Sequence, residues 1–179
     1  MTVGLPGDLS GREQTERMIR VDHAGEYGAT RIYAGQLAVL GRGEKGPLLR
    51  HMLEQEQEHL RTFNRMVGER RVRPTVMLPF WHLAGFALGA VTAAMGAKAA
   101  MACTVAVEEA IDAHYAGQLD ELGEREPELR QAVEKFRAEE LEHRDIGLEH
   151  GAEQAPAYRL LYQAIKTGCR VAIAISERV

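Results

Sequence analysis

The sequence predicts an all-α fold, and two features support this class. Its long segments are rich in Ala, Leu, Glu, Gln and Arg, which favour helices, and its six prolines lie at the edges of those segments. The 179 residues and the hydrophobic content of 45% suit one domain, residues 1–179, with one continuous core. Long helices are expected at 11–40, 48–71, 98–123, 128–149 and 156–177, with a shorter apolar helix near 80–95.

Charge and cysteine content argue against several kinds of function. The formal net charge is only −4, and no basic block indicates a nucleic-acid partner. Cys103 and Cys169 lie far apart and form no CxxC pair, so they indicate neither a zinc site nor a disulfide framework. The N-terminal stretch MTVGLPGDLSGREQ has neither a signal-peptide nor a transit-peptide pattern. The chain is therefore expected to be mature and to lie in a reducing compartment inside the cell.

Two related stretches combine many carboxylates with one histidine: LEQEQEHL at 53–60 and RAEELEHR at 137–144. The residue four before each histidine is Gln55 in the first stretch and Glu139 in the second, so only the residue three before is a glutamate in both. The repeated motifs are Glu56-x-x-His59 and Glu140-x-x-His143.

Helical periodicity turns these motifs toward the core. Apolar residues at a spacing of three to four share a face with each motif, and the same holds for Glu26 and Glu108 on two further helices. Glu26 precedes Glu56 by 56 − 26 = 30 residues, and Glu108 precedes Glu140 by 140 − 108 = 32 residues, so two helix hairpins share one layout. Four helices thus each direct a carboxylate inward. Expected on solvated faces instead are Glu54, Glu58, Glu139 and Glu142.

Four ionised carboxylates in an apolar core require positive charge. No Lys or Arg shares these faces, so two metal ions are expected, with the two imidazoles among their ligands. One Glu from each of two helices and one Glu-x-x-His from each of two others is the pattern of ferritin-like di-iron or di-manganese bundles. The predicted fold is a ferritin-like four-helix bundle with a dinuclear site, an added apolar crossover helix and a C-terminal helix. The predicted metal ligands are Glu26, Glu56, His59, Glu108, Glu140 and His143.

Four other polar residues have two interpretations each. Asp22 and Asp145 lie near the motifs, where each either orients a ligand imidazole from behind or belongs to the surface. His114 and Tyr115 lie two turns beyond Glu108 and form either a proton or electron relay or, as we favour, a hydrogen-bonded core pair.

The run from Thr75 to Ala97 contains no charged residue and is long enough to suggest a membrane span. One crossing here would place Glu26 and Glu56 on one side of a bilayer and Glu108 on the other, which would divide the site. The run is therefore expected to lie in a membrane interface or to cover an apolar pocket. The alternative is an ordinary buried crossover helix.

Long blocks of the chain resemble the demethoxyubiquinone hydroxylase family, the di-iron monooxygenases of ubiquinone biosynthesis. These blocks are RVDHAGEYGATRIYAGQLAVL, EQEHLRTFN, AVEEAIDAHY and the run from KFRAEELEHR to the C-terminus. The resemblance implies that the six predicted ligands hold two iron ions, with Glu56 and Glu140 among the bridging carboxylates. It further implies a 3-demethoxyubiquinol 3-hydroxylase that uses O2 and draws electrons ultimately from NAD(P)H. The string GRGEKG at 41–46 fits GxGxxG in its letters, but it forms a turn between two expected helices and does not follow a strand, so it is not a fingerprint for that cofactor.

The resemblance also implies partners and a location. The substrate is a polyprenylated methoxy-benzoquinol, and the candidate partners are membrane lipid, a lipid-binding protein of ubiquinone biosynthesis and further copies of the chain. The location is peripheral, on the inner face of a bacterial cell membrane, or on the matrix side of the mitochondrial inner membrane for a processed eukaryotic form. The alternatives are ferritin-like iron storage or peroxide detoxification, and a metal-stabilised helical module that docks on a lipid carrier.

Overall fold

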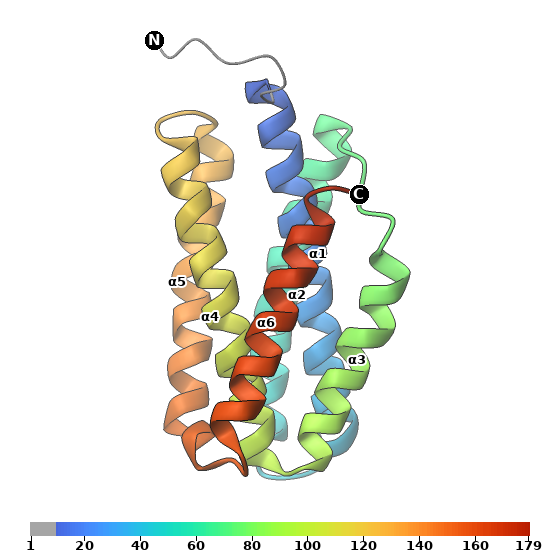
Figure 1. Ribbon diagram of the computed structural model, residues 1–179, viewed down its shortest axis with the longest axis vertical. Coiled ribbons are helices and arrows are strands. Elements are labelled where there is room, and N and C mark those ends of the chain that lie inside the picture. Colours follow the sequence, from blue (N-terminus) through green and yellow to red (C-terminus); the bar gives the residue numbers. More distant parts are fainter. Residues whose placement is uncertain (1–9) are drawn as a thin grey trace.

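The computed structural model describes residues 10–179, which fold into helices joined by short loops (Figure 1). Residues 1–9, with Pro6 and most of the N-terminal stretch predicted to lack a targeting signal, lie outside the described residues. The all-α class is therefore confirmed for residues 10–179. The elements are α1 (Gly11–Leu40), α2 (Gly46–Arg70), α3 (Leu78–Ala94), α4 (Ala97–Leu122), α5 (Pro127–Glu149), a 3-10 turn (Ala152–Gln154) and α6 (Tyr158–Ser176).

The helices begin where capping chemistry allows. The hydroxyl of Ser10 accepts the backbone N–H of Glu13, and the Glu13 carboxylate accepts the backbone N–H of Ser10, which satisfies two donors at the start of α1. Pro47 and Pro127 occupy the first turns of α2 and α5, where a missing N–H costs nothing. Every expected helix boundary falls within two residues of the observed one.

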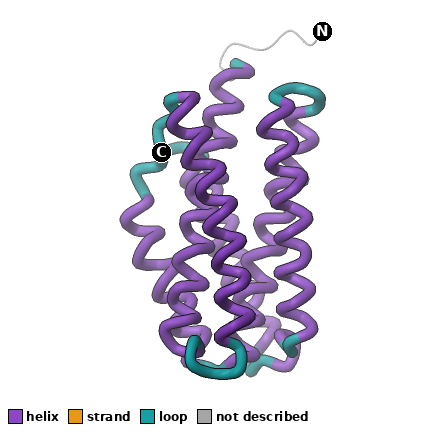
Figure 2. Tube along the Cα trace, turned by 180° about the vertical axis from the view of Figure 1, so that it is seen from behind, coloured by secondary structure: helices purple, strands orange, loops and turns teal. Residues whose placement is uncertain are grey.

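Two helix hairpins form the bundle. α1 packs on α2 and α4 packs on α5, with further contacts between α1 and α4 and between α2 and α5. The loops gather at the two ends of the long axis (Figure 2). α3 leads from the end of the first hairpin to the start of the second and packs mainly on α1, while α6 packs mainly on α4 (Figure 1). The predicted ferritin-like bundle with a crossover helix and a C-terminal helix is confirmed.

The backbones of α1 and α3 lie in direct contact. A methyl group added at Gly89 would lie 1.9 Å from the carbonyl oxygen of Ile32, and one added at Gly35 would lie 2.2 Å from the carbonyl oxygen of Phe86. Only glycine fits at such distances. A stripe of small residues therefore faces α1, and the buried residues of α3 are Gly85, Gly89, Thr92 and Ala93.

Three large apolar residues of α3 face outward. Phe80, Leu83 and Val91 are 56%, 70% and 59% exposed, and they follow one another at helical spacing along one side. The alternative of an ordinary buried crossover helix is therefore wrong, because three of its large apolar side chains contact solvent. Among residues 10–179 no helix combines the length and the hydropathy that a bilayer crossing requires.

Candidate metal centre

Six buried side chains meet inside the bundle. α1 and α4 each supply one glutamate, and α2 and α5 each supply a glutamate and the histidine three residues after it. Each of these residues is at most 1% exposed. The helical phase expected from the apolar stripes is therefore correct on all four helices. The six residues are Glu26, Glu56, His59, Glu108, Glu140 and His143.

These side chains form two overlapping groups, each able to surround one metal ion. Within each group the candidate ligand atoms, one per residue, lie within 4.8 Å of one another. Two carboxylates belong to both groups, which is the arrangement that lets a carboxylate bridge two ions. The first group is Glu26, Glu56, His59 and Glu140, and the second is Glu56, Glu108, Glu140 and His143.

The inward atoms lack hydrogen bonds. Both carboxylate oxygens of Glu56 and of Glu140, and the Nδ1 atoms of His59 and His143, are buried without a hydrogen-bond partner. Each Nδ1 nevertheless lies close to carboxylate oxygens, at 3.2 and 3.3 Å for His59 and at 3.1 and 3.4 Å for His143. An unsatisfied buried polar group costs about 1–3 kcal/mol, and a coordinated cation would remove that cost. The donor set of carboxylates and imidazoles fits iron or another transition-metal ion.

The pKa values show how the metal-free cluster obtains positive charge. Burial, with the charge of Glu140 second, raises the pKa of Glu56 and of Glu108 well above the usual value. Burial opposes protonation of His59, but Glu140 and Glu26 outweigh this effect and raise its pKa to about 12. Burial likewise opposes ionisation of Glu140, yet His143 and His59 hold its pKa at about 2. Protons thus occupy the cluster when metal is absent.

Each imidazole makes its outer contact with the opposite motif. Nε2 of His59 lies 2.6 Å from Oε2 of Glu139, the residue before Glu140. Nε2 of His143 lies 2.9 Å from Oε1 of Gln55, the residue before Glu56. With Nε2 bonded outward, Nδ1 of each ring faces the carboxylates, so the outer contacts fix the ring orientations.

This arrangement corrects two expectations. Asp145 does not orient an imidazole, because it is exposed and pairs with the neighbouring Arg144 at 2.6 Å. Glu139 is not on a solvated face, because its side chain is only 25% exposed and contacts His59. Gln55 and Glu139 were visible in the sequence as the residues before each motif glutamate. Their role depends on α2 and α5 facing each other, which the sequence pattern of one helix does not encode.

Two buried tyrosines link the halves of the site. Tyr33 of α1 donates a 2.7 Å hydrogen bond to Oε1 of Glu108 on α4, and Tyr115 of α4 donates a short hydrogen bond to Oε1 of Glu26 on α1. Burial, followed by the charge of the partner glutamate, raises both tyrosine pKa values, so the hydroxyls remain protonated donors. Each tyrosine follows the glutamate of its own helix by seven residues. That shared spacing could have revealed Tyr33 alongside Tyr115.

Asp22 lies behind the site rather than at an imidazole of the two motifs. Its Oδ1 accepts a 2.7 Å hydrogen bond from Nε2 of Gln118 and lies 3.3 Å from Nε2 of His114. The expectation that Asp22 orients His59 or His143 is therefore wrong. Burial raises the pKa of Asp22, although His114 and Gln118 lower it in part.

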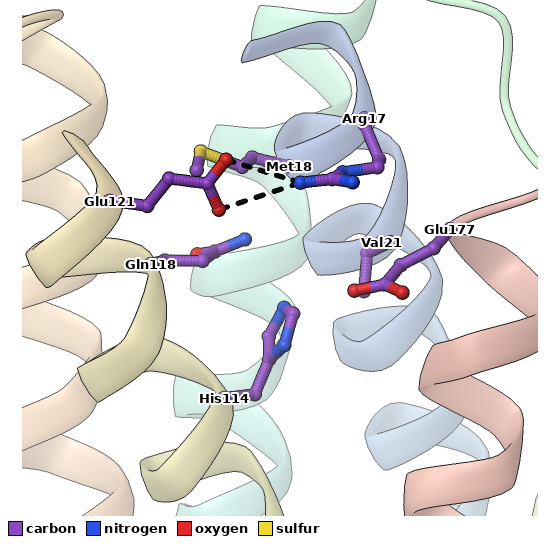
Figure 3. Close-up of a pocket in the computed structure, with 7 residues that line it drawn as sticks. All are labelled: Arg17, Met18, Val21, His114, Gln118, Glu121 and Glu177. Carbon is purple, nitrogen blue, oxygen red and sulfur yellow. Dashed lines mark hydrogen bonds and ion pairs between the residues drawn. The ribbon is translucent and has the colours of Figure 1, made fainter. Parts of the chain in front are cut away.

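A small pocket connects this polar group with the surface. It has a volume of about 80 Å³ and lies among α1, α4 and the C-terminal end of α6 (Figure 3). His114 and Gln118 line it, and Arg17 and Glu121 form an ion pair of 3.2 Å across its rim. His114 and Tyr115 therefore differ in position. Tyr115 contacts Glu26 directly, whereas His114 lies between Asp22 and the pocket.

The bundle and the two overlapping glutamate–histidine groups define a ferritin-like protein with a candidate site for two metal ions. Residues 13–176 match the family described as "Ubiquinone biosynthesis protein COQ7", and the chain belongs to that family.

Curated relatives match almost the whole chain. The "NADPH-dependent 3-demethoxyubiquinone 3-hydroxylase, mitochondrial" of Bos taurus is 58% identical over 180 residues, covering 98% of this chain and 83% of the relative. The "3-demethoxyubiquinol 3-hydroxylase" of Rhodospirillum rubrum is 59% identical over 176 residues, with the same two coverages. The "5-demethoxyubiquinone hydroxylase, mitochondrial" of Saccharomyces cerevisiae is 43% identical over 181 residues, covering 92% of this chain and 78% of the relative.

Proposed function

We propose that the chain is a di-iron monooxygenase that hydroxylates the ring of a polyprenylated demethoxyubiquinol. The observation that carries this proposal is the pair of overlapping ligand groups, which share two carboxylates inside a ferritin-like bundle. The names of the curated relatives support the reaction and the ring that it modifies. The proposed iron ligands are Glu26, Glu56, His59, Glu108, Glu140 and His143.

The reaction has a defined balance. One atom of O2 enters the ring as a hydroxyl group, the other leaves as water, and two electrons and two protons are consumed. Two iron ions held by the six residues would supply the redox chemistry toward O2. We assign the electrons ultimately to NAD(P)H, in keeping with the term "NADPH-dependent" in the name of the Bos taurus relative.

The side chains of the bundle would perform the remaining tasks. The two tyrosines hold Glu108 and Glu26 in place by hydrogen bonds, so these carboxylates cannot turn freely. Apolar residues keep water from the imidazoles. The centroid of the Phe136 ring, for example, lies 4.0 Å from that of the His59 ring. Asp22, with His114 at the pocket, would supply a polar route from the surface toward Tyr115.

The outer surface of α3 supports a membrane location. Its exposed row of Phe80, Leu83 and Val91 carries no charge, and Leu160 of α6 is also 74% exposed. A helix with such a face lies in the interface of a bilayer rather than across it. We therefore propose peripheral attachment, on the inner face of a bacterial membrane or the matrix side of the inner mitochondrial membrane. The same apolar surface is where we propose that a lipid-binding partner protein, or a second copy of the chain, would bind.

Product analysis tests the hydroxylase proposal. The purified protein is loaded with Fe²⁺ and supplied with NADPH, ¹⁸O2 and a short-tailed demethoxyubiquinol, and mass spectrometry follows the ring. The expected product contains one ¹⁸O atom, and its formation depends on iron. Uptake of iron and consumption of O2 without a hydroxylated ring would contradict the proposal and would favour storage or peroxide chemistry.

A further inference from the structure

The outer contacts of the two imidazoles differ in charge. His59 faces the carboxylate of Glu139 at 2.6 Å, and His143 faces the amide oxygen of Gln55 at 2.9 Å. The inward groups of the two halves correspond to one another. Each half has a motif glutamate, an inward Nδ1 atom and a glutamate held by a tyrosine from the opposite hairpin.

Glu139 lies at the edge of the core beside a cation. Its side chain is partly exposed, and Lys135 Nζ lies 3.7 Å from its free oxygen Oε1. Gln55 also lies at the edge of the core, but its amide is neutral at every accessible pH. The two imidazoles therefore differ in the acceptor that they contact, which is a carboxylate oxygen for His59 and an amide oxygen for His143.

A charged acceptor changes the ligand that it contacts. When one imidazole nitrogen donates its hydrogen to a carboxylate, the other ring nitrogen becomes more basic. The effect is smaller when the acceptor is an amide oxygen. Charge-assisted hydrogen bonds are also shorter and about twice as strong as neutral ones, in line with the two distances. Nδ1 of His59 should thus be the stronger donor to a cation.

We propose that Glu139 and Gln55 make the two metal positions unequal, so that the position at His59 binds the first metal ion more tightly. This inference rests on the proposed dinuclear site and assigns Glu139 as a positioning residue that acts through His59. The position at His143, with a neutral outer partner, fills second.

Titration of the metal-free protein with Co²⁺ tests this order. Co²⁺ gives visible bands on coordination, and binding requires no turnover, so the result is independent of whether hydroxylation is detected. The wild-type protein should bind two ions in two phases. Glu139→Gln should weaken the tighter phase by about 10- to 100-fold and leave the weaker phase nearly unchanged.

Two further variants separate charge from structure. Glu142→Gln removes an exposed carboxylate three residues along α5 and should leave both phases as in the wild type. The double variant Gln55→Glu/Glu139→Gln moves the carboxylate from the partner of His59 to the partner of His143. It should therefore restore a tight binding phase. Circular dichroism confirms that each variant keeps its helix content.

Proton NMR of the Zn²⁺-loaded protein provides a second measurement. Two Nε2–H resonances of different shift are expected, and Glu139→Gln should move the more downfield one toward the other. The proposal is overturned by two equal binding constants in the wild type, by an unchanged tight phase in Glu139→Gln, or by a double variant that stays weak.

Discussion

Tyr33 of α1 crosses to α4 and donates a 2.7 Å hydrogen bond to Glu108, a residue 75 positions away in the chain. Both side chains are almost fully buried. This contact ties the two hairpins together at the candidate metal centre, and Tyr115 does the same for Glu26 in the opposite direction.

Tyr33→Phe should therefore destabilise the metal-free protein. The substitution keeps the ring but leaves one oxygen of Glu108 without its donor, which costs about 1–3 kcal/mol of unfolding free energy. Urea unfolding in the presence of a chelator measures this change. An unfolding free energy equal to that of the wild type would mean that the bond contributes nothing.

Glu56→Ala and His143→Ala should each abolish loading of two iron ions while most helix content remains. Each variant removes an inward ligand, and the apolar stripes that form the bundle stay intact. Elemental analysis measures the iron content, and circular dichroism measures the helix content. Glu58→Gln and Glu142→Gln serve as controls, because both glutamates are exposed and their substitution should preserve iron content and activity. Two irons per chain in Glu56→Ala would disprove the six-ligand assignment.

The metal-free protein should lose stability as pH rises from about 5 to about 9. Burial raises the pKa of Glu56 and Glu108, and neighbouring carboxylates raise that of His59 to about 12 against the effect of burial. These groups keep their protons in the folded chain at pH values where the unfolded chain has released them. The slope is about 1.4 kcal/mol per pH unit for each group that is protonated only in the folded chain, and His59 adds to it only above about pH 6.5, where the unfolded imidazole loses its proton.

The lowered pKa of Glu140 changes stability with pH in the opposite direction. Its lowered pKa, about 2, adds stability that is lost only as pH falls from about 4 toward 2. Urea unfolding at several pH values checks both directions. The metal-loaded protein should show a much flatter profile, since metal replaces the protons, and metal binding should release protons into weak buffer. A metal-free stability that rises between pH about 5 and 9 would contradict this account.

Leu83→Glu should weaken membrane binding. The residue is 70% exposed on the apolar row of α3, so a charge there costs little in the free protein and opposes burial in a bilayer. Vesicle flotation should fall, and turnover of a long-tailed quinol should fall more than that of a short-tailed analogue. Leu88→Glu is the matched contrast, because Leu88 packs against the core and its substitution should destabilise the fold itself. Equal loss with both substrates in Leu83→Glu would argue against membrane docking.

Gly89→Ala should destabilise the protein by about 1–3 kcal/mol, because the added methyl group would collide with the carbonyl oxygen of Ile32 at 1.9 Å. Gly68→Ala in α2 is the control. A methyl group there meets no atom within 4 Å, so helix propensity should stabilise the chain by about 0.5–1 kcal/mol. Thermal or urea unfolding compares the two, and a neutral Gly89→Ala would show that α3 shifts easily.

The inward set was predictable because a helix repeats every 3.6 residues. Once Glu56 and His59 share a stripe with apolar residues, their burial follows from the sequence alone. The contacts across the bundle were harder to predict. Glu139 lies off that stripe, and its contact with His59 depends on how closely α5 approaches α2. Asp145 lies only two residues after His143 in the sequence, but its side chain points outward.

For α3 too, the sequence showed the composition of the helix but not its contacts with other helices. Its lack of charge was visible between Thr75 and Ala97, but composition did not tell which side faces α1. Three glycines decide this, because Gly35, Gly85 and Gly89 allow the closest approach of the two backbones. Phe80, Leu83 and Val91 are left exposed on the opposite side.

The glycine contact also has a kinetic consequence. Two helices whose backbones touch cannot pivot on flexible side chains, so α3 moves with α1 and with Glu26 as one rigid body. α6 is held through side chains instead, because Trp81 of α3 donates a 3.2 Å hydrogen bond to Ser176 and Lys166 lies 2.6 Å from the carboxylate of Glu109 on α4. A change in the tilt of α6 can therefore be taken up by side chains, whereas α3 can only follow α1.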